Sequence, residues 1–317
     1  MSARLRPAER DVHPRLGMTA EPWPALPLAA WRDTRETLHR WAQILGKCQL
    51  ALTPMINHWW NVSLEITPRG FSTSLLAYRD RWFDLELDFF EDVLRLRISD
   101  GTTRTISLAS TTVAELYAET RAMLYDAGIA VQISPIPAEI DDKTPFDRDT
   151  HRAYDKAYVL AFWTIVARSA TVLSTFRAGF IGKSSPVQFY WGHLDLAQSR
   201  FSGRLAPATI GDPIEREAYS HEVFSVGWWA GDSRFEKPAY YAYAAPEPAG
   251  FSAATIATPH AYYHAPLHGF YLDYDDVRRA PDPAALILDF CNATYEAAAT
   301  LGTWDRAALE RDPKRAA

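Results

Sequence analysis

The 317-residue chain has only two cysteines, Cys48 and Cys291, and neither belongs to a CxxC pair. Folds that depend on disulfides, and zinc sites built from thiolates, need more cysteines at closer spacing. The N-terminal segment also has no apolar stretch of the kind that a secretory signal requires. The sequence therefore predicts free thiols in a reducing compartment, and we expect a cytoplasmic protein.

The chain has fewer basic than acidic side chains. It contains 33 Lys and Arg and 39 Asp and Glu, which gives a formal net charge of -6. No block of basic residues occurs, and binding to nucleic acid or to an anionic membrane depends on such blocks. We expect neither of these partners. The longest apolar run, residues 157–167, is too short to span a bilayer and predicts a buried helix.

Motifs of several common enzyme classes are missing. There is no G-x-S-x-G, which marks the nucleophile of α/β-hydrolases. The string "GKSSP" at 182–186 fails as a phosphate loop, because Arg177 occupies the place of its first glycine. His260 and His264 have the spacing of zinc ligands on a helix, but no third ligand is evident and a surface turn is expected. The sequence therefore predicts no cofactor and no metal.

Aromatic side chains, by contrast, are abundant: the chain has 11 Trp, 15 Tyr and 15 Phe, and it is 48% apolar. This balance is typical of a soluble globular protein with a large core. Aromatic rings fill such cores, and they also line pockets for small molecules.

Helical and strand-like patterns follow one another twice. A helix near 28–45 precedes several short strands between 61 and 99, and a helix near 111–128 follows them. A helix over about 149–178 opens a second series of strands, which a helix over 282–301 closes. This order predicts an α+β fold of two similar repeats, each a mostly antiparallel sheet flanked by helices. The expected boundaries are a disordered N-terminal tail (1–20), a first repeat (21–134), a connection (135–148), a second repeat (149–304) and a charged C-terminal tail (305–317).

A comparison at an offset of 130 residues supports the repeat. Residues 59–72, "WWNVSLEITPRGFS", align without a gap on residues 189–202, "FYWGHLDLAQSRFS". We read residues 186–197 as one continuous strand, and 131–137 as another short strand.

Strand alternation then predicts a polar face. It would carry Trp191, His193 and Asp195 on the same side of the sheet. If this face turns inward, the cleft between the repeats is the natural ligand site; alternatively, the face is simply solvated.

His193 and Asp195 also suggest an iron site. With His268 they would form the two-histidine, one-carboxylate triad of Fe(II) oxygenases that use 2-oxoglutarate, and Arg278 would hold the oxoglutarate. A chance H-x-D is an equally good explanation in a chain with nine histidines.

His221 and Glu222 are neighbours in the string "YSHEV". Because adjacent strand residues point to opposite faces, the two side chains cannot bind one metal together. Either can still act as a general acid or base, His221 near neutral pH. The alternative is a core histidine bonded to the backbone.

Arg200 and Arg204 follow the same strand four residues apart. Two guanidinium groups at this spacing can hold a carboxylate or a phosphate. The alternative is a structural role in ion pairs with acidic side chains such as Asp84, Glu86 or Asp88.

Strings such as "NHWWNVSL", "GKSSPVQFYWG", "DLAQSRFSGR" and "AAPEPAGF" are specific enough to compare with known families. By these strings the chain resembles an uncharacterised bacterial family of unknown function, from Trp23 to Trp304. The resemblance implies one family unit and carries no activity, ligand or cofactor. His193 and His268 depart from the family pattern, which counts against the iron site. The positions that the resemblance marks are His58, Asp195, Arg200, Arg204, His221, Glu222 and Glu247.

We therefore expect a small anionic molecule to be bound or transformed in an aromatic-lined cleft between the repeats. The alternatives are a non-catalytic scaffold protein and the Fe(II) oxygenase. The expected catalytic residues are His221, Glu222, Asp195 and His58. The expected substrate-binding residues are Arg200, Arg204, Trp191 and Glu247.

Overall fold

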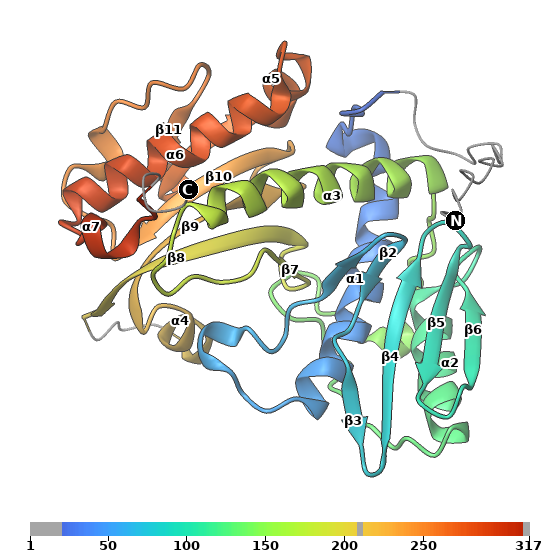
Figure 1. The fold of residues 1–317 in the computed structure, drawn as a ribbon. Helices are drawn as coiled ribbons and strands as arrows, with labels where there is room; N and C mark the ends of the chain where they lie inside the picture. The colour runs from blue at the N-terminus through green and yellow to red at the C-terminus, as the bar shows by residue number, and fades with distance from the viewer. Residues whose placement is uncertain (1–20, 208–211, 313–317) are drawn as a thin grey trace, which may run out of the picture.

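The computed structural model describes residues 21–207 and 212–312, so the expected N-terminal tail lies outside the described residues. The first half begins with a long helix that leads into a sheet and a second helix (Figure 1). Its helical elements are α1 (Leu28–Leu52), η1 (Asn57–Trp59) and α2 (Val113–Asp126). Its strands are β1 (Glu65–Thr67), β2 (Gly70–Ser72), β3 (Leu76–Tyr78), β4 (Arg81–Asp88), β5 (Val93–Ile98) and β6 (Thr103–Ser107).

The second half follows a connecting segment, residues 129–155, whose helical content is the single turn η2 (Phe146–Arg148). Its helices are α3 (Lys156–Ala178), α4 (Pro213–Ala218), α5 (Tyr274–Arg279), α6 (Pro283–Leu301) and α7 (Arg306–Leu309), with the turns η3 (Phe251–Ala253) and η4 (Ala265–Leu267). Its strands are β7 (Gln188–Tyr190), β8 (Asp195–Leu205), β9 (His221–Trp229), β10 (Ala239–Ala245), β11 (Tyr262–His264) and β12 (Gly269–Asp273).

The described strands form two antiparallel sheets of six strands each. The first has the order β1-β2-β4-β5-β6, with β3 paired to β4, and the second has the order β11-β12-β10-β9-β8-β7. The structure thus confirms the predicted α+β class and its two sheet units.

Helix boundaries follow local capping chemistry. Thr112 and Glu115 form a reciprocal capping box at the start of α2, and Gly128 with φ 77° follows its end, as the sequence predicts. Helix α3 begins at Lys156, later than residue 149, because the Asp155 side chain accepts the free backbone N–H groups of the first turn.

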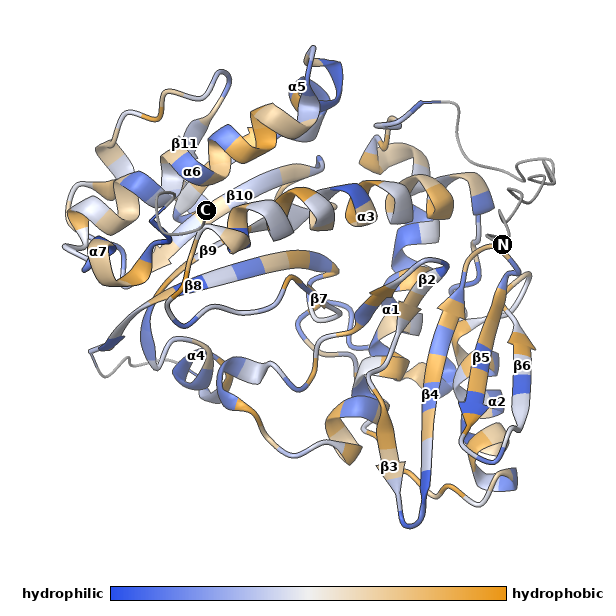
Figure 2. Ribbon diagram, viewed as in Figure 1, coloured by the Kyte–Doolittle hydropathy of each residue, from blue (hydrophilic) through white to orange (hydrophobic). Residues whose placement is uncertain are grey.

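Helices α3 and α6 pack side by side and contact one face of the second sheet. Figure 2 shows that α3 is largely apolar. Its length and composition would allow it to cross a membrane, but most of its apolar stretch is buried inside the protein. The helix therefore matches the buried helix that the sequence predicts.

The two sheets meet at their edges. The backbone N–H of Leu64 donates to the carbonyl oxygen of Phe189 at 2.8 Å, which links the start of β1 to β7. Next to this link the rings of Phe71 and Phe189 stack with centroids 4.1 Å apart. One hydrophobic core consequently runs through both halves.

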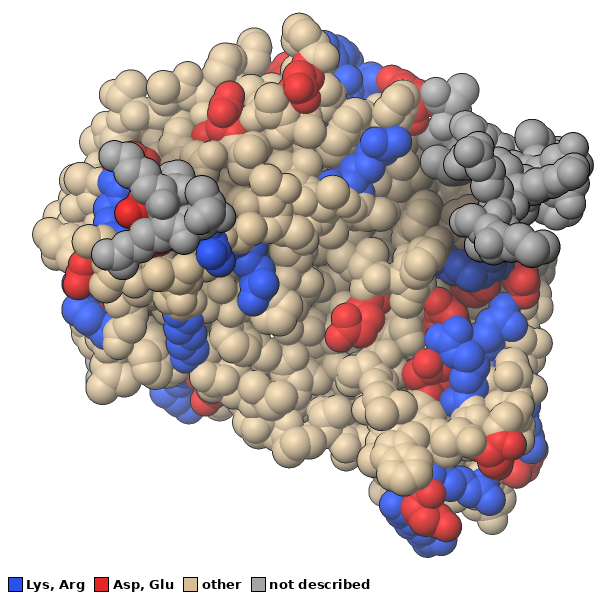
Figure 3. Space-filling model, viewed as in Figure 1, with Lys and Arg blue, Asp and Glu red and all other residues tan. Residues whose placement is uncertain are grey.

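Charged side chains gather on the first sheet, where Figure 3 shows basic and acidic groups interleaved. Arg69 lies 2.5 Å from Asp88, and Arg97 lies 2.9 Å from Asp84. These carboxylates are therefore engaged within their own sheet and do not pair with the arginines of β8.

The strand predicted over residues 186–197 is wrong in its middle. Strand β7 ends at Tyr190, a turn occupies 191–194, and β8 starts at Asp195, which pairs with Tyr190. Leu194 in this turn has φ 57°, a left-handed conformation that is foreign to strands. Trp191 and His193 therefore do not share a strand face with Asp195.

The alignment at an offset of 130 residues also fails in detail. Residues 65–72 contain β1, a tight turn and β2, whereas the residues aligned with them, 195–202, all belong to the single strand β8. The short strand predicted over 131–137 is absent, because these residues have no strand pairing. The two halves share an order of elements, but the proposed residue equivalences do not hold.

Helix α1 packs tightly against the turn between β7 and β8. A Cβ atom on Gly46 would lie 2.2 Å from ring atoms of Trp191, far inside van der Waals contact. Trp191 is 4% exposed, and its Nε1 donates to the carbonyl oxygen of Val62 at 2.7 Å. The indole is thus held between α1 and the segment around Val62.

This contact predicts the effect of Gly46→Ala. Alanine in a helix interior normally stabilises by about 0.5–1 kcal/mol relative to glycine. Here overpacking against Trp191 should outweigh that gain, and we expect a net loss of roughly 1–3 kcal/mol in the free energy of unfolding. Chemical denaturation measures it, with Ser174→Ala on the exposed face of α3 as the control. A variant as stable as the wild type would contradict the close approach.

Candidate functional site

A cavity of about 290 Å³ lies between the two halves. Helix α1, the connecting segment, and the β7–β8 and β9–β10 turns form its walls. No Phe, Tyr or Trp is among its lining residues within the described part of the chain, so it differs from the aromatic-lined cleft expected from the sequence. Its charged lining residues are Arg32, Arg35, Glu36, Glu139, Asp141, Asp142, Asp232 and Arg234.

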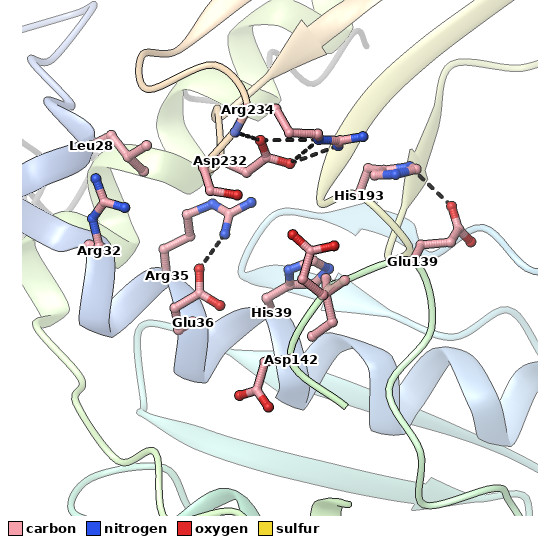
Figure 4. A pocket seen from close by; sticks show the side chains of 13 residues that line it. Leu28, Arg32, Arg35, Glu36, His39, Glu139, Asp142, His193, Asp232 and Arg234 are labelled. Atoms are coloured by element: carbon pink, nitrogen blue, oxygen red, sulfur yellow. Dashed lines mark hydrogen bonds and ion pairs between the residues drawn. The ribbon is translucent and has the colours of Figure 1, made fainter. Parts of the chain in front are cut away.

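One face of α1 supplies the most buried wall. Arg32, Glu36 and His39 follow one another at helical spacing, with Arg35 beside them, so their side chains project to the same side. Figure 4 shows α1 running beneath the cavity with these side chains rising from it. Across the cavity, Arg234 pairs with Asp232 at 2.7 Å. The charges therefore come from both halves of the chain.

His39 is neutral and keeps one ring nitrogen free. Its Nε2 lies 2.9 Å and 3.0 Å from the backbone carbonyl oxygens of Trp191 and Gly192, so this nitrogen carries the proton and donates. Burial, together with the charge of Arg35, lowers the pKa of His39 to about 3. Its Nδ1 is thus a hydrogen-bond acceptor, and it has no partner among the described residues.

Arg35 is a buried cation with spare donor capacity. The residue is 3% exposed, and its Nη1 donates to Glu36 Oε1 at 2.6 Å. Its Nε is buried and has no partner among the described residues. Burial lowers the pKa of Arg35, yet a guanidinium keeps its charge at neutral pH. Figure 4 places this group between the side chains of Glu36 and Asp232.

The connecting segment closes the cavity because α1 holds it by polar side chains. The Gln43 amide makes two 2.8 Å hydrogen bonds with the backbone of Ala138, one as donor and one as acceptor. Arg40 lies 2.6 Å from both Asp142 and Asp149. Since Arg40 and Asp149 are each 1% exposed, this ion pair is a buried anchor.

Groups that titrate near neutral pH lie at the edge of the cavity. His193 Nδ1 is 3.0 Å from Glu139 Oε2, and the Tyr241 hydroxyl donates to Asp195 Oδ2 at 2.5 Å. Burial raises the pKa of Asp195 to about 6. Burial alone would lower the pKa of His193, but the hydrogen bond to Glu139 and the charge of Asp195 raise it. The pKa values of His193 and Asp195 are therefore both raised above their ordinary values, and the charges of the two side chains influence each other.

The structure places Arg200 away from this cavity. Arg200 is 4% exposed, and its guanidinium lies against the rings of Phe176 and Tyr295, 3.4 Å and 4.3 Å from their centroids. It also donates to the carbonyl oxygen of Phe176 near the end of α3. These contacts occupy the guanidinium within the core, and its ligand-binding role stays a prediction.

Arg204 and Glu222 form a pair elsewhere on the second half. Arg204 Nη2 is 2.6 Å from Glu222 Oε2 and also donates to the Gly302 carbonyl oxygen at the end of α6. Glu247 accepts a 2.5 Å hydrogen bond from the Tyr263 hydroxyl on the exposed surface. None of these three side chains lines the cavity described above.

His58 and His221 come together in a third place. Their ring centroids are 5.6 Å apart, and the His58 ring stacks on Phe201 at 4.4 Å. Glu222 points away from His221, as alternation along β9 predicts. The structure therefore separates the predicted catalytic residues into Asp195 near the cavity, the histidine pair, and Glu222.

The predicted iron triad does not converge. His193 lies in the turn before β8, whereas His268 precedes β12, on the other side of β9 and β10 in the sheet. Three strand spacings separate β8 from β12 by about 14 Å, while ligands of one metal must lie within a few ångströms of each other. Among the described residues, no group of three His, Cys, Asp or Glu side chains is placed to hold a metal.

Sequence reasoning missed Arg35, His39 and Arg234. Arg35 and His39 belong to a row of polar residues along α1, which could have indicated them. Such a row is also typical of a solvated helix face. Arg234 lies in the turn between β9 and β10, where no periodic pattern marks it.

Comparison with known proteins now gives the family. The model of a family of unknown function, DUF5996, matches residues 23–311. The chain belongs to this family. No curated protein matches the chain, and no solved structure does. The DUF5996 match confirms the resemblance found in the sequence, and it carries no established activity.

The environment of Asp195 predicts how stability depends on pH. Its pKa is higher in the folded protein than in the unfolded chain, so the linked stabilisation is complete below about pH 4 and is lost as the pH rises through about 6. Asp195→Asn should therefore be more stable than the wild type at pH 7.5, by on the order of 1–2 kcal/mol, and the difference should shrink toward pH 4.

Urea denaturation across this pH range measures the effect. Asp84→Asn, which removes a surface ion pair with Arg97, is the matched control and should gain no stability at pH 7.5. If Asp195→Asn is no more stable than the wild type at any pH, the carboxylate is not the buried charge described here.

Proposed function

We propose that the cavity between α1 and the turns of the second sheet binds a small polar molecule through an anionic group. The observation that carries the proposal is that two residues lining the cavity, Arg35 and His39, each have a buried polar atom, Nε and Nδ1, with no hydrogen-bond partner among the described residues. An unpaired buried polar group costs about 1–3 kcal/mol, and a ligand that supplies the missing partner removes this cost.

The two atoms also define the chemistry of the ligand. Arg35 offers a charged donor, which suits a carboxylate or phosphate oxygen. His39 Nδ1 offers a neutral acceptor, which suits a hydroxyl or an N–H group of the same molecule. Glu139 and Asp141 add negative charge to the lining, so a zwitterionic or hydroxylated anion is favoured over a simple inorganic one.

The size of the cavity sets a further limit. A volume of about 290 Å³ lies at the lower end of the range for small-molecule sites. This size favours a small metabolite as the ligand. His193 lines the cavity and Asp195 follows it at the start of β8, so a reaction at this site would use these two side chains as acid and base.

The proposal is tested by exchanging Arg35 for methionine. A panel of hydroxylated carboxylates, amino acids and sugar phosphates is screened by thermal shift, since a bound ligand raises the melting temperature. We expect a compound that stabilises the wild type to bind Arg35→Met roughly tenfold more weakly or worse, because a charged hydrogen bond is lost. Calorimetry gives the two dissociation constants.

Two further variants make the test specific. Arg97→Met removes an arginine from the first sheet that does not line the cavity, and it should bind as the wild type does. Arg32→Ala removes an exposed lining residue without disturbing the core and should weaken binding moderately. If no compound stabilises the wild type, or if Arg35→Met responds equally, the proposal is wrong.

A further inference from the structure

Lys183 lies in the string "GKSSP" and has an unusual partner for a lysine. Its Nζ is 2.6 Å from Nε2 of His58, and neither residue lines the cavity described above. No carboxylate contacts this amine among the described residues. Glu217, whose charge acts on Lys183, accepts a hydrogen bond from the backbone N–H of His58. The lysine is thus paired with a neutral base instead of an acid.

The tautomer of His58 is fixed by the backbone. Its Nδ1 lies 3.0 Å from the carbonyl oxygen of Ala218, so Nδ1 carries the proton and donates. Nε2 is left as an acceptor that faces the amine of Lys183. Burial and the charge of Lys183 both lower the pKa of His58, which keeps its ring neutral. An amine, a base and a group that orients the base therefore stand in sequence, as in activated nucleophiles.

Aromatic rings lie close to the amine of Lys183 and partly shield it from water. Lys183 Nζ lies 4.9 Å from the ring centroid of Phe201 and 5.8 Å from that of Trp60. This burial lowers the pKa of Lys183, and His221 adds a further basic ring next to His58. Lys183 itself stays partly exposed, so a small molecule can reach the amine.

The backbone beside the amine is held in a costly conformation. His58 and Trp59 both have positive φ values, 61° and 60°. Consecutive non-glycine residues in this region cost of order 1–3 kcal/mol each and tend to occur at functional sites. This strain is an observation independent of the hydrogen bonds, and it positions the ring that faces Lys183.

We propose that Lys183 is a reactive amine that forms an imine with small aldehydes or ketones, with His58 as its base. His58 Nε2 takes a proton from the ammonium group, and the free amine attacks the carbonyl carbon. The carbonyl oxygen then takes protons and leaves as water while the C=N bond forms. In balance, an ammonium group and a carbonyl compound give a protonated imine and one water, and the charge stays on nitrogen.

The experiment compares lysines within the same protein. Wild-type protein is treated with acetaldehyde and sodium cyanoborohydride, which reduces any imine to a stable secondary amine, and mass spectrometry of peptides follows each lysine. Lys156 and Lys237 are the internal controls, because each amine contacts an aspartate. We expect Lys183 to react roughly tenfold faster than both at pH 7, and this advantage should shrink toward pH 10 as all lysines lose their protons.

A substitution of His58 tests whether this residue acts as the base or whether Lys183 reacts only because it is exposed. His58→Asn suits the left-handed backbone and can still accept a hydrogen bond, but it cannot take a proton at neutral pH. It should lower the rate at Lys183 to that of Lys156, with an unchanged melting temperature as the check on folding. If Lys183 reacts no faster than Lys156 and Lys237 in the wild type, the proposal is overturned. If His58→Asn leaves the rate unchanged, His58 is not the base.

Discussion

The structure depends on one set of interactions: buried polar side chains of α1 that bond to the backbone of irregular segments. Loops inside a protein leave N–H and C=O groups that need partners. Gln49 bonds to the backbone of Asn61, Ser63 and Ser74, and Gln43 bonds to that of Ala138. A helix can do this because its own backbone is already satisfied, which leaves its side chains free to serve other segments.

The cavity lies where this set of interactions is incomplete. On α1, Nε2 of His39 donates to the backbone of the β7–β8 turn, and its Nδ1 has no partner among the described residues. Arg35 donates from Nη1 to Glu36, and its Nε has no partner among the same residues. Buried polar networks are stabilising when they are fully satisfied and costly when they are not. The α1 residues that stabilise the fold and the α1 residues proposed to bind a ligand are therefore neighbours, and both sets belong to the polar face of this helix.

Local sequence predicted those elements whose boundaries are set by local chemistry. The capping box of α2 and the paired strands β4 to β6 are of this kind. The turn at 191–194 was missed because its aromatic and apolar residues favour a strand, while the packing of Trp191 against Gly46 decides otherwise. For the same reason the α1 residues of the cavity were not recognised: a polar helix face does not reveal whether water or another segment covers it.

Strand β8 explains why the predicted site residues do not form one site. Asp195 begins this strand beside the cavity, Arg200 points to the helices on the opposite face, and Arg204 lies within the irregularity near the end of the strand. A strand of this length spans roughly 30 Å, and alternation sends neighbours to opposite faces. Residues close in sequence are thereby distributed to the cavity, the core and the end of α6. The ring of Phe201, on the same strand, contacts Lys183, so β8 contributes residues next to both proposed sites.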